Sequence, residues 1–193
     1  MHVLRAHFPI SCPMFASPDQ WIRALRAAAG PGTLPDLDGA PPSFRKRKDA
    51  DAVLWDAAAA GSAPGALDAA DRLLAARPGS SLADAEGYLA LEVWTECELS
   101  ALHALSRIVR LHPTPSRRAR FDELCRWHIE HTQPDNATNR PWAVHVFAKS
   151  RAPEAILYAE TLLHNVSASD ARHEPLSRWI LLDAVRELEL EQR

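Results

Sequence analysis

Cysteine is scarce in this chain of 193 residues, which has only Cys12, Cys97 and Cys125. No two of these residues form a CxxC pair, and three thiols cannot make a fully paired disulfide framework. Disulfides persist mainly in oxidising compartments, so the sequence predicts reduced thiols and a cytoplasmic protein. The frequent use of Ala, Arg and Pro is typical of a bacterial source with a GC-rich genome.

Long apolar runs are also missing from the chain. No window approaches the roughly 18 uncharged apolar residues that a membrane-spanning helix requires. The first residues contain no extended apolar core ahead of their prolines, so they do not resemble a secretory signal. We therefore expect neither secretion nor a membrane partner.

The sequence lacks the glycine-rich and catalytic motifs that identify common enzyme classes. It contains no GxGxxG, GxxxxGK[ST], GxSxG or HExxH pattern, so nucleotide binding and serine or zinc hydrolysis have no support. The net charge is −3. The two basic runs, 45–48 and 117–120, have no interleaved aromatic residues that could stack on bases, so we expect solvated runs and no nucleic-acid partner.

Helical periodicity dominates the sequence. With 47% hydrophobic and 24% charged residues, it predicts an all-α single domain of about seven helices packed as successive antiparallel hairpins. Residues 1–48 are predicted to form an N-terminal arm with one helix, capped by Ser17, and a Pro/Gly-rich linker, and residues 49–193 a helical domain. The expected helical segments are 18–29, 49–60, 64–76, 82–111, 116–132, 142–147, 152–167 and 175–191. Gly87 or residues 93–95 are alternative points at which the segment 82–111 breaks in two.

Glu98 is the most unexpected residue of the longest predicted helix, which Ser81 would cap. On a helical wheel it projects from the apolar side, which includes Leu91 and Trp94 and continues along the helix, whereas Glu96 falls on a side predicted to be solvated. On the next helix, His128 likewise lies on the apolar face. Buried polar groups need partners, so we predict that Glu98 and His128 lie within hydrogen-bond or one-water reach of each other.

Five further candidate binding residues follow in the sequence: Arg140, Trp142, His145, Glu160 and His164. Asp135 or Asn136 is predicted to cap an ordered turn, and Arg140 to pair with a carboxylate, most favourably Glu160 or Asp183. Glu160 and His164 are four residues apart on one helix, a spacing that typically allows a shared hydrogen bond.

Metal and thiol chemistry are weaker alternatives. Cys125, His128 and His131 offer three soft ligands for zinc, but at three-residue steps their side chains do not converge well, so we expect no metal or other cofactor. A catalytic pair of Cys125 with His128 or His145 lacks a third orienting group.

Two local resemblances come from short segments. Residues 72–78 and 107–113 are alike at a spacing of about 35 residues, which is close to the tetratricopeptide period, although no third copy follows. The segment from Trp127 through the apolar helix that bears Trp142 resembles the helix-loop-helix unit of the α/α toroids, which include terpene cyclases. It lacks the glycine of that unit, and the chain has too few helices for a closed toroid, so neither resemblance assigns a family.

Two functions are compatible with these features. The absence of a complete catalytic constellation favours a non-enzymatic interaction or scaffold protein, with a protein partner or a second copy of itself. The alternative is a small-molecule-binding protein or enzyme with a polar pocket around Glu98, His128, Arg140 and His145. A cavity at these residues would favour the alternative, and their mutual saturation without a void would favour the interaction protein.

Overall fold

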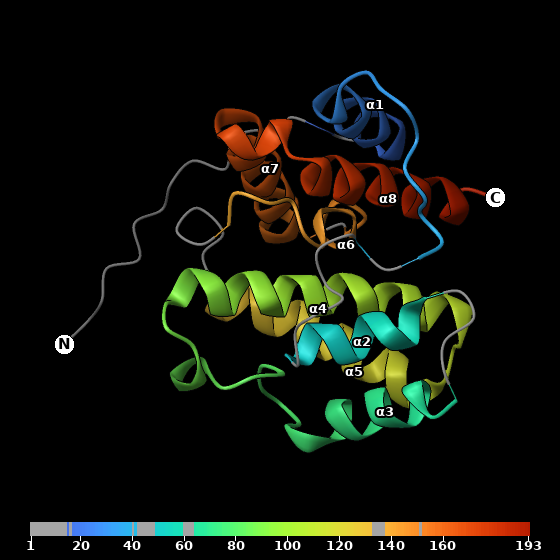
Figure 1. The fold of residues 1–193 in the computed structure, drawn as a ribbon, viewed down its shortest axis with the longest axis vertical. Coiled ribbons are helices and arrows are strands. Elements are labelled where there is room, and N and C mark those ends of the chain that lie inside the picture. Colours follow the sequence, from blue (N-terminus) through green and yellow to red (C-terminus); the bar gives the residue numbers. More distant parts are fainter. Residues whose placement is uncertain are drawn as a thin grey trace.

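A computed structural model describes residues 15, 17–39, 41, 49–59, 64–132, 138–150 and 152–193. In these ranges the chain forms eight α-helices, two short 3-10 helices and no strand, which confirms the predicted all-α fold (Figure 1). The helices are α1 (Pro18–Ala29), α2 (Ala50–Ala58), α3 (Ala66–Ala76), η1 (Ala85–Gly87), α4 (Leu91–Leu111), α5 (Pro115–His131), α6 (Val144–Ala148), α7 (Pro153–Ala168), η3 (Asp170–His173) and α8 (Pro175–Glu191).

Local capping signals define two of the helix starts. Ser17 Oγ accepts a hydrogen bond from the Gln20 N–H at 3.4 Å, and Gln20 Oε1 accepts one from the Ser17 N–H at 3.1 Å. This reciprocal pair is the capping box that the sequence predicts for the first helix. At α5, Thr114 Oγ1 accepts from the Arg117 N–H at 3.2 Å and satisfies one of the free N–H groups of the first turn.

The longest helix begins nine residues later than predicted, at Leu91 instead of Leu82. Ser81 does not cap it, because its hydroxyl donates to the Ala83 carbonyl oxygen at 2.8 Å. Residues 82–90 instead run beside α4, where the Leu82 and Ala83 N–H groups bind the carboxylate of Glu98. Leu91, which was expected on the packing face, is therefore left exposed at the start of the helix.

Helix α4 forms the centre of the fold. Every residue from 97 to 109 is buried, so this part of the helix is covered on all sides. The contacts α2 with α3, α4 with α5 and α6 with α7 are those that successive hairpins would make, whereas α1 packs on α8 and α2 packs on α4 outside that order (Figure 1). The division of the chain near residue 48 stays a prediction.

The basic run 117–120 is only partly solvated, because Arg118 is exposed but the arginines at both ends are not. Arg117 and Arg120 are both buried, because they satisfy groups of α3 that lie against the start of α5. Arg117 makes a two-pronged ion pair with Asp71, with both N–O distances 2.7 Å, and Arg120 donates to the Leu74 carbonyl oxygen at 3.2 Å. These arginines therefore fasten α5 to the C-terminal half of α3. The run 45–48 lies outside the described residues.

Candidate functional site

The seven predicted site residues do not meet in one pocket. They occupy four environments. Two are buried: the pair of Glu98 and His128, and a cluster that includes His145. The third joins the half-buried Arg140 to the buried Trp142 through Glu96, and the fourth is a flank of α7 that carries Glu160 and His164.

Glu98 and His128 form a fully buried pair between α4 and α5. His128 Nε2 lies 3.6 Å from Glu98 Oε2, which confirms the predicted proximity, although this distance is too long for a direct hydrogen bond. The strongest partners of Glu98 are instead the N–H groups of Leu82 at 3.0 Å and Ala83 at 2.6 Å. The carboxylate thus fixes the segment before α4, a role that a helical wheel cannot show because these amides belong to irregular backbone.

Arg140 pairs with carboxylates that the sequence analysis did not select. Its NH1 group lies 2.6 Å from Glu96 Oε1, and its Nε lies 2.9 Å from Glu174 Oε2. The indole N–H of Trp142 donates to the same Glu96 oxygen at 3.3 Å. The prediction that Arg140 pairs with Glu160 or Asp183 is wrong, and Asp183 is buried and paired with His103 and Arg107. Glu96, which was predicted to be solvated, is 29% exposed and pairs with Arg140.

The α7 flank is separate from this group. Glu160 is half-buried and accepts a hydrogen bond from the Phe15 N–H at 3.4 Å, whereas His164 is exposed. The predicted caps at Asp135 and Asn136 fall in residues 133–137, outside the described residues.

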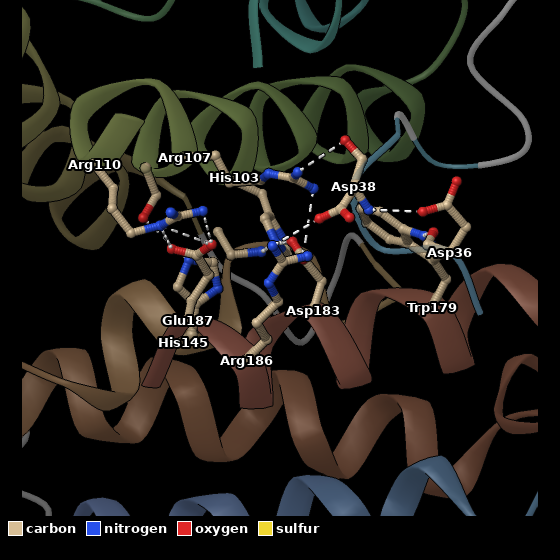
Figure 2. Close-up of polar contacts among 12 residues, drawn as sticks. Asp36, Asp38, His103, Arg107, Arg110, His145, Trp179, Asp183, Arg186 and Glu187 are labelled. Atoms are coloured by element: carbon tan, nitrogen blue, oxygen red, sulfur yellow. Dashed lines mark hydrogen bonds and ion pairs between the residues drawn. The ribbon is translucent and has the colours of Figure 1, made fainter. Parts of the chain in front are cut away.

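A row of buried ion pairs between α4 and α8, which we call the charged seam, was not predicted from the sequence. It consists of His103, Arg107 and Arg110 of α4 with Asp183 and Glu187 of α8. His103 Nε2 lies 3.0 Å from Asp183 Oδ2, and Arg107 NH1 lies 3.5 Å from Asp183 Oδ1 (Figure 2). One turn further along both helices, Arg110 forms a two-pronged ion pair with Glu187, with two N–O distances of 2.8 Å. The spacing could have revealed the seam, because positions 103, 107 and 110 share one face of α4 and positions 183 and 187 share one face of α8.

The hydrogen bonds of His103 define its tautomer. Its Nδ1 accepts from the Ala143 N–H at 3.2 Å, so the ring proton is on Nε2 and is donated to Asp183. Ala143 adopts a φ of 57°, a left-handed conformation that is strained for a residue with a Cβ atom. The backbone is thus held in an unfavourable conformation at the point where it meets this buried histidine.

Three tryptophans enclose the seam. Trp55 lies 6.0 Å from Trp142 and 5.5 Å from Trp179, measured between ring centroids. The guanidinium of Arg107 stands 5.6 Å from the ring centroid of Trp55 and 6.0 Å from that of Trp179. The two aromatic rings and the Asp183 carboxylate together offset the desolvation of the Arg107 guanidinium, which is only 2% exposed.

His145 and Ser106 are as close as a catalytic base and its nucleophile would be, but both side chains are buried. His145 Nε2 lies 3.1 Å from Ser106 Oγ, while its Nδ1 has no hydrogen-bond partner among the described residues. Burial, and then the nearby His103, lower the pKa of His145 well below its usual 6.5, so the ring is neutral. Both side chains are buried, and neither lines the three clefts formed by described residues 15–35, 92–96, 138–140 and 168–178, so the pair packs within the core.

The three candidate zinc ligands have different surroundings in the structure. His128 faces Glu98, whereas His131 is exposed, bonds the Trp127 carbonyl oxygen through Nδ1 at 2.9 Å and stacks on the Trp127 ring. Burial raises the pKa of the Cys125 thiol to about 12. Within the described parts of the chain, no three His, Cys, Asp or Glu side chains are grouped as metal ligands.

Asp51, near the start of α2, is a further buried acid outside the seam. Its Oδ1 accepts from the Ala52 N–H at 2.9 Å, but its Oδ2 has no hydrogen-bond partner in the described residues. Burial raises the pKa of this carboxyl from 3.8 to about 6, although nearby hydrogen-bond donors, chiefly Cys97, partly oppose the shift. Burial likewise raises the pKa of the Cys97 thiol to about 12.

We expect Asp51→Asn to stabilise the protein at neutral pH. Because the folded-state pKa is raised, the folded protein holds this proton more tightly, and the free energy of unfolding falls as pH rises from about 4 to about 6. The variant should be more stable by about 1 to 3 kcal/mol near pH 7.5 and should show little gain near pH 4. Urea unfolding at both pH values measures this difference.

Asp56→Asn is the matched control, because Asp56 lies exposed on the same helix. It should change stability by no more than about 0.5 kcal/mol at either pH. An equal gain for Asp51→Asn at both pH values would contradict the shifted ionisation of Asp51.

An open cleft lies where the start of α4, the 138–140 segment and the end of α7 meet. Its volume is about 690 Å³, and we call it the acidic cleft because it is lined by four carboxylates and one guanidinium. The lining residues are Glu92, Val93, Glu96, Thr138, Asn139, Arg140, Ala168, Ser169, Asp170, Ala171 and Glu174.

An apolar patch adjoins this cleft. Leu89, Leu91 and Val93 retain 106%, 59% and 44% exposure, although they are large hydrophobic residues within a five-residue stretch. Val93 also lines the acidic cleft, so one of the three exposed residues lies at its edge. This part of the described structure brings exposed hydrophobic residues close to an open, acidic cleft.

Comparisons with known proteins do not add a family: no protein-family model matches the chain, and neither a curated protein nor a solved structure matches it. In the described residues, no helix is both long and apolar enough to cross a membrane.

Proposed function

We propose that this protein is a non-enzymatic interaction protein that binds a partner protein through the apolar patch and the acidic cleft. The main evidence is that Leu89, Leu91 and Val93 are all exposed. Large hydrophobic side chains that are exposed close together in the chain are unfavourable in water, and exposed apolar surface commonly marks a binding surface. The cleft beside them supplies the polar rim that protein interfaces usually have.

The buried polar groups support this choice over catalysis. Glu98, His128 and His145 are fully buried, and only Arg140 among the predicted pocket residues lines an open cleft. Core N–H groups engage Glu98, and two carboxylates engage Arg140. Neither ring nitrogen of His128, nor Nδ1 of His145, has a hydrogen-bond partner among the described residues, so the four predicted pocket residues are only partly saturated. A small-molecule site around Glu98, His128, Arg140 and His145 therefore has less support.

The partner surface should combine apolar and basic side chains. Leu89, Leu91 and Val93 would be covered by apolar groups, and the carboxylates that line the cleft attract positive charge. A partner segment with a lysine or arginine beside hydrophobic residues meets both requirements.

Capture from lysates of the cells that make the protein tests this proposal. Tagged wild-type protein and the Leu89→Ser/Leu91→Ser/Val93→Ser variant are compared by quantitative mass spectrometry. We expect the variant to capture at least about tenfold less of the specific partner than the wild type does. Central apolar contacts contribute much of the binding free energy at interfaces. Circular dichroism of both proteins checks that the fold is kept.

Leu157→Ser is the matched control, because Leu157 is 61% exposed on α7 and is not part of the patch. It should retain the partner at the wild-type level. Equal loss in both variants, or no loss in either, would refute the role of the patch. Capture of the chain by a second copy of itself would show that the occupant is not a different protein.

A further inference from the structure

The charged seam lies where two layers of helices meet. Helices α2, α3, α4 and α5 pack on one another in the first layer, and α1 packs on α7 and α8 in the second layer, as α6 does (Figure 1). The seam joins α4 of the first layer to α8 of the second. We propose that the seam is an acid-sensitive latch, in which protonation of His145 on α6 parts the two layers.

The buried charges of the seam are balanced while its histidines are neutral. Arg107 and Arg110 contribute two positive charges, and Asp183 and Glu187 contribute two negative charges that pair with them (Figure 2). A proton added to His145 would give this group of side chains a net positive charge. Charge without a counter-ion is unfavourable in the poorly solvated interior, so the added proton opposes the closed packing.

His145 cannot satisfy a second N–H group in the closed structure. The side chain is fully buried, and its Nε2 lies 3.1 Å from Ser106 Oγ. Its Nδ1 has no hydrogen-bond partner among the described residues. A protonated imidazole carries an N–H group on both nitrogens, so the N–H group at Nδ1 would be buried without an acceptor.

The groups closest to His145 also disfavour its protonation. The rings of His103 and His145 lie 4.4 Å apart, measured between centroids. Burial, followed by His103, lowers the pKa of His145 well below 6.5, and Lys149, Arg107 and Arg110 act in the same direction. The ring is therefore neutral while the layers are closed.

The carboxylates that face α6 from α8 are already engaged. Asp183 pairs with His103 and Arg107, and Glu187 pairs with Arg110. These two carboxylates thus have no free charge that could compensate a protonated imidazole.

Two further titratable groups lie on or beside α6. Tyr158 of α7 packs on Phe147, with ring centroids 4.3 Å apart, and its hydroxyl is hydrogen-bonded to Thr132. Lys149, at the end of α6, pairs with Glu191 at 2.6 Å. Neither pair supplies a negative charge for the imidazole.

The direction of the pH effect follows from this packing. Parting the layers brings His145 into water, where its pKa returns to about 6.5, so the open form binds the proton more tightly than the closed form does. The closed form is fully favoured above about pH 6.5, and its closing equilibrium constant falls up to about tenfold for each pH unit below that value. From about pH 7.5 to about pH 5, the expected loss is about thirtyfold.

Parting the layers would also open the acidic cleft. Glu92 and Glu96 line this cleft from α4, whereas Asp170 and Glu174 line it from the second layer. We therefore expect partner binding at this face to weaken in acid, a consequence that rests on the proposed function. The latch itself does not rest on it, because amide exchange tests the latch and the apolar-patch variant tests the proposed function, so either can fail alone.

Amide hydrogen exchange of the full chain tests the latch. Val146 and Lys149 donate their N–H groups to the carbonyl oxygens of Ala143 and His145. Protection factors correct for the effect of pH on chemical exchange, and in the wild type we expect those of these two amides to fall about thirtyfold from about pH 7.5 to about pH 5. The variant His145→Gln keeps a side-chain N–H group but cannot take up a proton, so its protection factors should fall less than about threefold.

His164→Gln is the matched control, because His164 is exposed on α7. It should lose protection as the wild type does. Asp51 and His128 are present in all three proteins, so their ionisation does not affect the comparison. An equal fall in the wild type and His145→Gln, or no fall in the wild type, would overturn the inference. A fall of the same size at the amides of α3 would mean that the whole fold opens, which would also overturn it.

The ring signal of His145 provides a second test that needs no variant. In the closed wild-type protein, the Cε1–Hε1 resonance of His145 should keep its neutral position from about pH 7.5 to about pH 5, because the closed form excludes the proton. Titration of this resonance near pH 6.5, with the protection of the α6 amides unchanged, would contradict the latch.

Discussion

Replacing Asp183 by alanine should destabilise the fold more than any other single change considered for this chain. The side chain of Asp183 is fully buried and compensates Arg107 and His103 of α4. Removing the carboxylate leaves the guanidinium of Arg107 buried without its counter-ion, which typically costs about 3 to 5 kcal/mol. Urea unfolding followed by circular dichroism measures the loss.

Two comparison variants show whether the lost charge of Asp183 causes the loss of stability. Asp183→Asn keeps the side-chain volume but removes the charge, so it should lose roughly half as much stability as the alanine variant. Glu189→Ala removes a partly exposed acid of α8 that pairs with Arg26, and it should cost at most about 1 kcal/mol. A loss below about 1 kcal/mol for Asp183→Ala would contradict the structural role of the seam.

Glu98→Ala should produce the second-largest loss of stability. The change removes the acceptor for the Leu82 and Ala83 N–H groups and the only charged neighbour that lies within 4 Å of His128 among the described residues. Unsatisfied buried amides cost about 1 to 3 kcal/mol each, and partial solvation limits the total to about 3 to 4 kcal/mol. Thermal unfolding of the purified variant provides the measurement.

The Glu98 variant should also release the segment before α4. Hydrogen exchange at Leu82 and Ala83 should rise strongly, because their amides lose their acceptor. Glu86→Ala, which alters an exposed side chain of the neighbouring η1, should change stability by no more than about 0.5 kcal/mol. Unchanged exchange at both amides would mean that Glu98 does not hold this segment.

Features that depend on neighbouring residues could be predicted from the sequence. The Ser17 and Gln20 capping box is encoded within four residues, and the burial of Glu98 and His128 follows from the apolar faces on which they lie. The start of α4 was missed because a distant side chain, Glu98, binds the amides of Leu82 and Ala83 and diverts the chain.

Features that depend on which elements meet could not be predicted. His103 and Arg107 lie on a side of α4 that would face water if Asp183 of α8 did not cover it. Arg140 finds Glu96 and Glu174, which are far from it in the sequence. Pairings of this kind depend on the packing order, which helical periodicity does not specify.

The acidic cleft and the apolar patch were missed for a related reason. Leu91 has the periodicity of a core residue, but the helix begins at that residue and leaves its side chain exposed. Thr138 and Asp170 belong to connecting segments, where no helical periodicity predicts which side chains are buried and which are exposed. The surface becomes recognisable only when α4, α7 and the 138–140 segment are placed together.

Site-specific photo-crosslinking tests the central claim most directly. A benzophenone amino acid is placed at Val93, where the apolar patch meets the acidic cleft, and at Leu157 as the exposed control, and the cells that make the protein are irradiated. The interaction account predicts one dominant adduct from Val93, joined to a partner segment that combines basic and apolar residues, and no such adduct from Leu157. The same weak adducts from both positions would contradict it.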